Sequence, residues 1–489
     1  MNIHVKDGEP AFVKRIIINN ANAIDSLNVI PAFDFLDSRI FNKFDLEENI
    51  GNILTLYENT GYPFIKIIIE SIHFYSDSSS GNSFADISLT IDRGSKNNID
   101  KIEIAGNTKT KDYVITRELR IQTGEYYSQK KIEELPDRLN RLRFFEPASI
   151  PSFYLTSKNE GVLVINIKEK ETNNFDGIVG YIPGVNNTPG YLTGLVNVNL
   201  RNIFGTGRIA TIRWQQVNQN SQELELHYLE PWFFGYPFNL NGSLLQRKQD
   251  SSYVQRTFEG SIEFLATENF SASLLLSSEV VIPTINDTYV PPVFNSSSVT
   301  TGISLKYDTR DDPYAPTKGI LFNNLDSFSK KRISGPSQLI TPETLTKVNL
   351  QRVQVDLGLF YSLFKRQVVA LGVHGRALLG PVFESSDLYR LGGTSTLRGY
   401  LENQFLGSRL MWTNLEYRFL LTRRSYLFTF FDTGYYFNSA IDKPEDYKIG
   451  YGLGLSIETG LGILGVSYAL GQGDTFARGK IHFGIINEF

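Results

Sequence analysis

The chain after Glu171 repeats one hydrophobic pattern, in which apolar and polar residues alternate over runs of roughly ten residues. The segment 223–228, for example, places its leucines and tyrosine on one face and its glutamates and histidine on the other. The polar face also carries many Gly, Ser, Asn and Gln residues, which suit a wet lumen. Such strands number about sixteen between Phe175 and Phe489, and an even number suits antiparallel closure. We therefore predict an all-β antiparallel transmembrane barrel over residues 172–489.

The connections between these strands alternate in length. Short ones, such as 422–425, alternate with long ones, such as 381–408. Outer-membrane barrels have short turns on the periplasmic rim and long loops on the outer rim. Because the chain enters its first strand from the short-turn side, we predict that the residues before 172 lie in the periplasm. The barrel is then expected in the outer membrane of a Gram-negative-type bacterium.

The composition agrees with this class and argues against others. The 489 residues include 25 Tyr, 34 Phe and no Cys, which suits a β-rich protein of an oxidising compartment. A net charge of −4 without a basic stripe argues against a nucleic-acid partner. The mean hydropathy of −0.18 is compatible with strands that face a polar lumen. Residues 1–10 lack the apolar core of a signal peptide, so we expect either a protein that is not exported or a mature chain with an added methionine.

The first third of the chain indicates two copies of one small α+β module, residues 1–94 and 95–171. The first copy has the order strand, helix, helix, strand, strand between Phe12 and about Asp92, and apolar residues at spacings of three and four predict one of its helices within 46–57. The second copy has the order strand, helix, helix, strand, strand, with Ser128 as the candidate N-cap of its second helix. A pair of generic α+β domains is the alternative. An open sheet edge in such a module can pair with an extended peptide.

The loop LGGTSTLRGY, Leu391–Tyr400, lies between two predicted barrel strands. Its paired glycines permit a tight turn, and Arg398 carries a permanent charge. Alternation places Glu416 and Asp432 on the lumen face of neighbouring strands. A loop folded into the lumen would let Arg398 form charge-assisted hydrogen bonds with both carboxylates. Two interpretations stay open: a latch that is released during function, and a fixed anchor for a plug.

The two ends of the predicted barrel indicate a weak seam. Glycines weaken the first strand and Pro183 removes a ladder donor, while the last strand ends on phenylalanine. A weak first strand beside the last strand would open sideways, and a tolerated irregularity near a turn is the alternative. The candidate seam residues are Phe175, Gly177, Ile178, Gly180 and Tyr181 on the first strand and Ile481, Phe483, Ile485 and Phe489 on the last.

Several motifs resemble those of the superfamily of outer-membrane protein assembly factors of the BamA and TamA type, which is related to two-partner-secretion transporters. LRGY at 397–400 is similar to the family's Val-Arg-Gly-Phe/Tyr motif, with leucine in place of valine, and FFDTG at 430–434 is similar to its Phe-x-Asp-x-Gly motif. The module order, with IAGNTKT at 104–110, resembles the polypeptide-transport-associated (POTRA) domain. Two POTRA copies match two-partner transporters and are fewer than in most proteobacterial assembly factors. The latch that the resemblance implies consists of Arg398, Gly399, Tyr400, Glu416, Asp432 and Gly434.

The resemblance implies a factor that captures clients at POTRA edges and inserts them into the membrane through the seam. A polypeptide-secreting transporter and a passive porin with periplasmic binding modules are the alternatives. The expected partners are unfolded outer-membrane proteins or a secreted polypeptide, the lipid bilayer and accessory lipoproteins of an assembly complex. We expect no enzymatic activity, no cofactor and no metal.

Other candidate sites are weaker in this sequence. Three aspartates at 308, 311 and 312 lack the spacing of a calcium-binding EF-hand loop and are better interpreted as a solvated turn. The alternating glycines 450, 452 and 454 resemble a phosphate loop only superficially, and small residues beside the buried loop explain them better. His374 and His482 face the predicted lumen without a serine–histidine–acid set, and we interpret both as structural.

Overall fold

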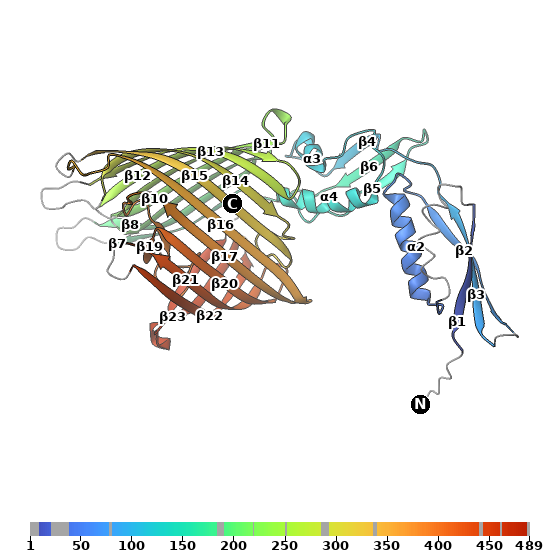
Figure 1. Cartoon of the computed structure of the whole chain (residues 1–489). Helices are drawn as coiled ribbons and strands as arrows, with labels where there is room; N and C mark the ends of the chain where they lie inside the picture. Colours follow the sequence, from blue (N-terminus) through green and yellow to red (C-terminus); the bar gives the residue numbers. More distant parts are fainter. Residues whose placement is uncertain are drawn as a thin grey trace. The chain divides into compact units, whose positions relative to one another are not determined.

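The computed structural model describes residues 9–20, 39–77, 81–182, 190–218, 220–249, 252–284, 293–335, 340–439, 444–459 and 462–486. The chain divides into two compact units, residues 1–170 and 171–489 (Figure 1). In the described stretches, no helix has both the length and the apolar character that a membrane-spanning helix requires.

The first module of the amino-terminal unit contains β1 (Ala11–Asn19), α2 (Lys43–Glu58), β2 (Lys66–Ser76) and β3 (Ser83–Asp92). Its sheet has the order β1-β3-β2, with β1 parallel and β2 antiparallel to β3. Helix α2 buries Leu46, Ile53 and Tyr57 in one core with Ile87 and Leu89 of β3. The sequence between β1 and α2 lies mostly outside the described residues, so the structure describes one helix of the predicted pair.

The second module shows the predicted order of strand, helix, helix, strand, strand. Its elements are β4 (Lys101–Ala105), α3 (Asp112–Leu119), α4 (Gln129–Leu142), β5 (Ser152–Leu155) and β6 (Gly161–Asn166). The sheet order is β4-β6-β5, and its core includes Leu119, Leu135 and Leu163, all fully buried.

The amino terminus of α4 is capped from the other module. Ser128 occupies the N-cap position, but its hydroxyl makes no capping hydrogen bond and donates instead to Asn59 Oδ1 at 3.1 Å. The same Asn59 oxygen accepts the backbone N–H of Lys130 at 2.8 Å. The predicted N-cap position of Ser128 is confirmed, but its side chain does not cap the helix, because Asn59, 71 residues before Lys130, accepts that backbone N–H instead.

The carboxy-terminal unit is built on a 16-stranded antiparallel sheet in which neighbours in the chain are neighbours in space (Figure 1). Its strands are β7 (Asn174–Ile182), β8 (Tyr191–Ile203), β9 (Arg208–Asn218), β10 (Ser221–Glu230), β11 (Phe238–Gln249), β12 (Tyr253–Leu265), β13 (Phe270–Pro283), β14 (Asn295–Asp308), β15 (Gly319–Gly335), β16 (Lys347–Phe364), β17 (Gln367–Leu379), β20 (Arg409–Leu420), β21 (Tyr426–Phe437), β22 (Glu445–Thr459), β23 (Gly462–Gly471) and β24 (Lys480–Ile486). The fold is the predicted outer-membrane barrel architecture.

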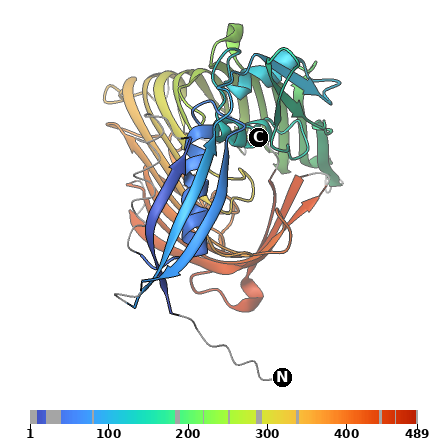
Figure 2. The same ribbon diagram turned by 90° about the vertical axis from the view of Figure 1, so that its right-hand side faces the viewer.

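The two faces of this sheet differ as the alternation predicts. Outward side chains such as Leu274 and Ile303 are apolar and are 65% and 56% exposed, as expected for residues that contact lipid on the outer face of a barrel. Inward positions such as Ser277, Ser298 and Ser329 are polar and buried. The sheet curls round on itself (Figure 2). Within the described residues its two edges, β7 and β24, are not hydrogen-bonded to each other.

The long connection between β17 and β20 carries a small hairpin of its own. Strands β18 (Tyr389–Leu391) and β19 (Phe405–Gly407) pair with each other. Leu391, Leu397 and Tyr400 from this connection are buried in one cluster with the inward Trp412 and Tyr436 of β20 and β21. Residues 380–408 therefore fold into the barrel lumen, and we call them the lumen loop.

Candidate functional site

The lumen loop turns sharply at its two glycines. Gly392 and Gly393 have φ angles of 117° and 101°, which residues with a Cβ rarely adopt. The N–H of Gly392 donates to the Thr396 hydroxyl at 2.9 Å, and the N–H of Gly393 donates to the Leu397 carbonyl at 3.0 Å. This turn delivers the next residues, the loop tip 398–400, to the inner wall of the barrel.

The guanidinium of Arg398 lies between a carboxylate of β21 and a carboxylate of β20. Nε and one terminal nitrogen donate to the two oxygens of Asp432 at 2.8 and 2.7 Å. The other terminal nitrogen donates to Glu416 at 2.6 Å, and the backbone N–H of Arg398 donates to Asp432 at 3.1 Å. Arg398 is 7% exposed and Asp432 is 0% exposed. Bidentate, charge-assisted bonds of this kind are the strongest that side chains form.

A second guanidinium balances the charges of this cluster. Glu416 also accepts from Nε of Arg418 at 2.8 Å, so two arginines face two carboxylates. Arg398 lies 3.7 Å from the ring centroid of Phe430, a favourable cation–π distance. Removing one member leaves a buried charge unpaired, which costs about 3–5 kcal/mol. The sequence interpretation missed Arg418, although alternation already places it on the same face as Glu416.

The remaining motif residues make room for the loop tip. Gly399 has a φ angle of 92°, and a Cβ there would lie 2.8 Å from the backbone where β23 ends. A Cβ on Gly434 would lie 2.8 Å from the side chain of Leu397. The Tyr400 hydroxyl donates to the Ile449 carbonyl of β22 at 3.0 Å. The structure thus brings together all six residues of the predicted latch.

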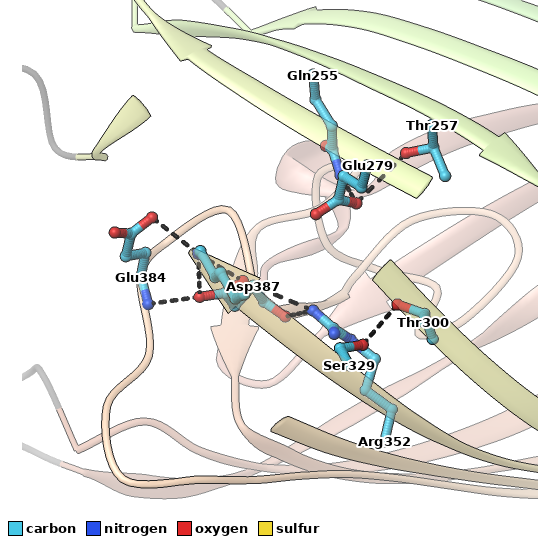
Figure 3. A network of polar contacts seen from close by, with 9 residues as sticks. Gln255, Thr257, Glu279, Thr300, Ser329, Arg352, Glu384 and Asp387 are labelled. Carbon is cyan, nitrogen blue, oxygen red and sulfur yellow. Dashed lines mark hydrogen bonds and ion pairs between the residues drawn. The ribbon is translucent and has the colours of Figure 1, made fainter. Parts of the chain in front are cut away.

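A second ionic cluster holds the first part of the lumen loop. Lys331, inward on β15 and 4% exposed, donates to Asp387 at 2.8 and 2.9 Å and to Glu384 at 2.9 Å. Arg352 of β16 donates to the Asp387 carbonyl at 3.2 Å, and the backbone N–H of Glu384 donates to the Asp387 carboxylate at 3.0 Å (Figure 3). Sequence reasoning did not find this cluster. An inward lysine in a polar lumen is common, and nothing local pairs it with a loop more than 50 residues away.

The lumen loop also reaches the first half of the barrel. Arg390 donates to Gln249 of β11 at 3.2 Å and to the Tyr253 hydroxyl of β12 at 3.1 Å. The loop is therefore fixed at three places on the inner wall: β11–β12, β15–β16 and the strands from β20 onward. It spans the lumen as a brace.

The seam residues lie on the two edge strands. Phe175, Gly177 and Tyr181 face outward on β7, and Phe175 and Tyr181 are 71% and 65% exposed. Gly180 faces inward, and β7 pairs with β8 along its whole length despite its glycines. Ile178 and Ile485 lie within β7 and β24. Ile481 and Phe483 face outward on β24, 61% and 68% exposed, and Phe489 lies outside the described residues.

The weaker sequence candidates have structural partners. Asp308 pairs with Arg310, Asp311 accepts a backbone N–H from Thr317, and Asp312 pairs with Arg424 at 2.7 Å. A Cβ on Gly450 would overlap the carbonyl oxygen of Arg398, so this glycine makes room for the loop tip.

The two lumen histidines differ in what they touch. His374 bonds Asp356 at 2.6 Å and stacks on Trp412, all within the barrel wall. His482 of β24 instead accepts the backbone N–H of Gly399 from the loop tip at 3.0 Å. Among the described residues, no group of three or more His, Asp or Glu side chains is arranged to hold a metal ion.

Comparisons with known proteins agree with this architecture. The Omp85 superfamily domain matches residues 202–489, and the surface antigen variable number repeat, a POTRA module, matches residues 98–170. The fold resembles the crystal structure of Haemophilus ducreyi BamA lacking POTRA domains 1–3, with a TM-score of 0.56 and 18% identity over 97% of this chain and 98% of that one. It also resembles CdiB from Escherichia coli, with a TM-score of 0.57 and 12% identity over 98% of this chain and 90% of that one.

Curated relatives agree with the family model. The outer membrane protein assembly factor BamA of Nitratidesulfovibrio vulgaris is 23% identical over 88% of this chain and 55% of its own length. BamA of Neisseria meningitidis is 26% identical over 38% of this chain and 22% of its own length. The match thus spans about half the length of the first relative and about a fifth of the length of the second. A superfamily domain that matches more than half of the chain defines its class: the protein belongs to the Omp85 superfamily. The family and these relatives point to the outer membrane as its location.

Proposed function

We propose that this protein inserts client β-barrels into the outer membrane through the seam between β7 and β24. The observation that carries this proposal is that the outer edges of β7 and β24 have no strand partner within the described residues, so that they offer backbone hydrogen-bond groups to an incoming strand. The backbone of a client strand would exchange its hydrogen bonds with water for hydrogen bonds with the edge of β7 or β24. Such an exchange needs no covalent catalyst, so we propose that the activity is not enzymatic.

The amino-terminal unit supplies a second edge for client capture. In its first sheet, the outer side of β1 is occupied by the segment 39–41, which exchanges hydrogen bonds with Ala11 and Val13. Strand β2 is eleven residues long and, within the described residues, pairs only with β3. Its Ile68 and Phe74 are 48% and 53% exposed. We propose that β2 holds extended clients by β-augmentation in the periplasm.

The seam proposal is tested by locking the two edges together. Because the chain has no cysteine, a panel of pairs can join Phe175→Cys, Gly177→Cys or Tyr181→Cys on β7 to Ile481→Cys or Phe483→Cys on β24. The oxidised pairs are expected to stop assembly of client porins in reconstituted membranes, and a reductant is expected to restore it.

The control for the lock is a disulfide elsewhere in the wall. Leu276 of β13 and Thr301 of β14 face outward opposite each other, so Leu276→Cys with Thr301→Cys adds the same bond away from the seam. This control should leave client assembly unchanged. Normal assembly by the locked seam variants would reject the seam as the route of insertion.

A secretion transporter is the second candidate, and the observation that favours it is the loop that spans the lumen. A transporter would pass its polypeptide through the lumen, which the loop spans from β12 to β21. Deleting residues 385–405 should then raise ion conductance in planar bilayers sharply and allow export of one partner. Depletion of the protein separates the two candidates, since an insertase loses many outer-membrane barrels and a transporter loses one exported protein.

The remaining partners follow from the insertase proposal. We propose unfolded outer-membrane proteins as clients, the bilayer as the acceptor phase and accessory lipoproteins as companions on the periplasmic side. A passive porin is the third candidate, and it would leave client assembly unchanged on depletion.

A further inference from the structure

The loop tip touches every strand from β20 to β24, not only the two that carry the acidic partners. Arg398 bonds β20 and β21, and Tyr400 bonds the Ile449 carbonyl of β22. The Tyr400 hydroxyl also accepts the backbone N–H of Gln472, just after β23. The backbone of Gly399 lies against the end of β23 and donates its N–H to His482 of β24. The tip is thus a strap across the last part of the sheet.

Strand β24 is the member of this set with the least support from the sheet itself. It is an edge strand, and within the described residues its ladder joins only β23, from Ile463 to Ala469. Its inner face meets the lumen loop at two neighbouring positions. His482 accepts from Gly399, and a Cβ on Gly484 would lie 3.3 Å from the methyl group of Thr394.

The contact with His482 fixes the state of the imidazole ring. A backbone N–H can only donate, so Nε2 of His482 must be the unprotonated acceptor and Nδ1 carries the proton. Nδ1 faces the Thr394 hydroxyl at 3.4 Å. His482 is 7% exposed, so loss of the acceptor would leave the Gly399 N–H without this partner in a buried place.

We propose that His482 is the positioning residue that couples the Arg398 latch to the seam. Through its bond to Gly399 it holds β24 against the loop tip, so that withdrawal of Arg398 from Asp432 also frees β24. While Arg398 contacts Asp432, β24 is held by both the loop tip and β23. Once Arg398 withdraws, β24 is held by β23 alone. The inference rests on the proposed seam function, because it names what gates that seam.

The test measures the position of β24 without a client. Spin labels on Phe483→Cys of β24 and Leu415→Cys of β20, both outward, report the distance between edge and wall in the full chain in lipid. His482→Leu is expected to raise the population at long distance by roughly tenfold, because a buried donor loses its acceptor. His482→Gln, which offers an amide oxygen near the place of Nε2, should restore the wild-type distribution. His374→Leu, which alters a lumen histidine outside the strap, should resemble the wild type.

The latch variant tests the coupling itself. Arg398→Ala should also raise the long-distance population, and adding His482→Leu should raise it less than the product of the two single effects, since both act through one loop tip. A wild-type distribution in His482→Leu, or equal distributions in the Leu and Gln variants, would overturn the proposal. Client assembly is measured separately on cysteine-free variants. If β24 moves in these variants while client assembly stays normal, the coupling is supported and the insertase proposal is rejected. If β24 does not move but the seam disulfide blocks assembly, the insertase proposal is supported and the coupling is rejected.

Discussion

The barrel and the amino-terminal unit each tie a loop to a distant strand with one carboxylate, but they satisfy that carboxylate differently. Asp432 in the barrel receives the guanidinium of Arg398 and is fully buried. Glu169, just after β6, is half-buried and receives the backbone N–H groups of Thr108, Lys109 and Thr110 together with the Thr108 hydroxyl. One carboxylate is matched by a cation and the other by a ring of backbone donors.

The difference decides how each attachment can be released. Burial raises the pKa of Glu169, but the hydrogen bonds from Thr108, Thr110 and Lys109 outweigh it and lower the pKa to about 2. This loop is therefore sensitive to acid. The barrel cluster contains two arginines, which keep their charge at any accessible pH. Release of this cluster would require the guanidinium of Arg398 to move away from Asp432 and Glu416.

The largest effect is expected for Arg398→Ala. The change leaves Asp432 and Glu416 buried without their shared cation, at a cost of about 3–5 kcal/mol. The folded barrel should convert to the unfolded form at a lower temperature in a heat-modifiability assay on gels. Arg409→Ala is the matched control, because Arg409 is an exposed arginine at the start of β20. Equal shifts in the two variants would show that the contacts of Arg398 stabilise the barrel no more than an exposed arginine does.

A smaller effect is expected for Lys331→Met in the second cluster. Asp387 would still accept the backbone N–H of Glu384 at 3.0 Å and would still lie 3.7 Å from the guanidinium of Arg352, so its carboxylate would remain paired. We expect the free energy of unfolding to fall by about 1–3 kcal/mol. The fall should appear as a lower conversion temperature in the same heat-modifiability assay. Lys330→Met, an exposed neighbour on the opposite face of β15, is the control. A loss as large as that of Arg398→Ala would make the base of the loop, and not its tip, the main attachment.

The acid sensitivity of Glu169 gives the next prediction. Its folded pKa lies below the ordinary value of 4.5, so its contribution is complete above about pH 4.5 and falls as the pH drops toward 2. Solvent screening of this half-buried group reduces the effect to about 1–2 kcal/mol. The protection of the amides of residues 108–110 against exchange, relative to free amides at the same pH, should fall over that range in the wild type and equally in the control Glu160→Gln, which keeps Glu169. In Glu169→Gln the exchange should already be fast at pH 6 and should gain little on acidification. A wild-type profile in Glu169→Gln would show that the donors around Glu169 do not hold the loop.

The fold follows from the sequence wherever one local rule decides. Alternation with a period of two fixes which residues face the lumen, so the strands and the faces of Glu416 and Asp432 are predictable. The turn glycines and the charge of Arg398 then leave few places for the loop tip. What the pattern does not fix is which strands face each other across the lumen. That depends on the tilt and stagger of the whole sheet.

Two of the contacts that sequence reasoning missed depend on this stagger, whereas Arg418 lies two residues from Glu416 on the same strand. Lys331 meets Asp387 across 56 residues, and Gly399 meets His482 across 83. Neither pair shares a motif or a strand neighbour. A catalytic triad consists of side chains, whereas the contact of His482 is with a backbone N–H, which no sequence motif marks. Polar lumen residues on edge strands are the signal that points to such contacts.

The smallest predicted effect concerns the cap that joins the two amino-terminal modules. Asn59→Ala removes the oxygen that accepts the Lys130 N–H, which is expected to cost about 1 kcal/mol. Amide exchange at the start of α4 should rise by roughly fivefold, as that free energy implies. Asn59→Asp keeps the acceptor and should retain most of the protection. Ser128→Ala should have the smaller effect, because Ser128 only donates to the same oxygen. If Ser128→Ala were the more damaging change, the cap would be local after all, and the two modules would be joined by other contacts.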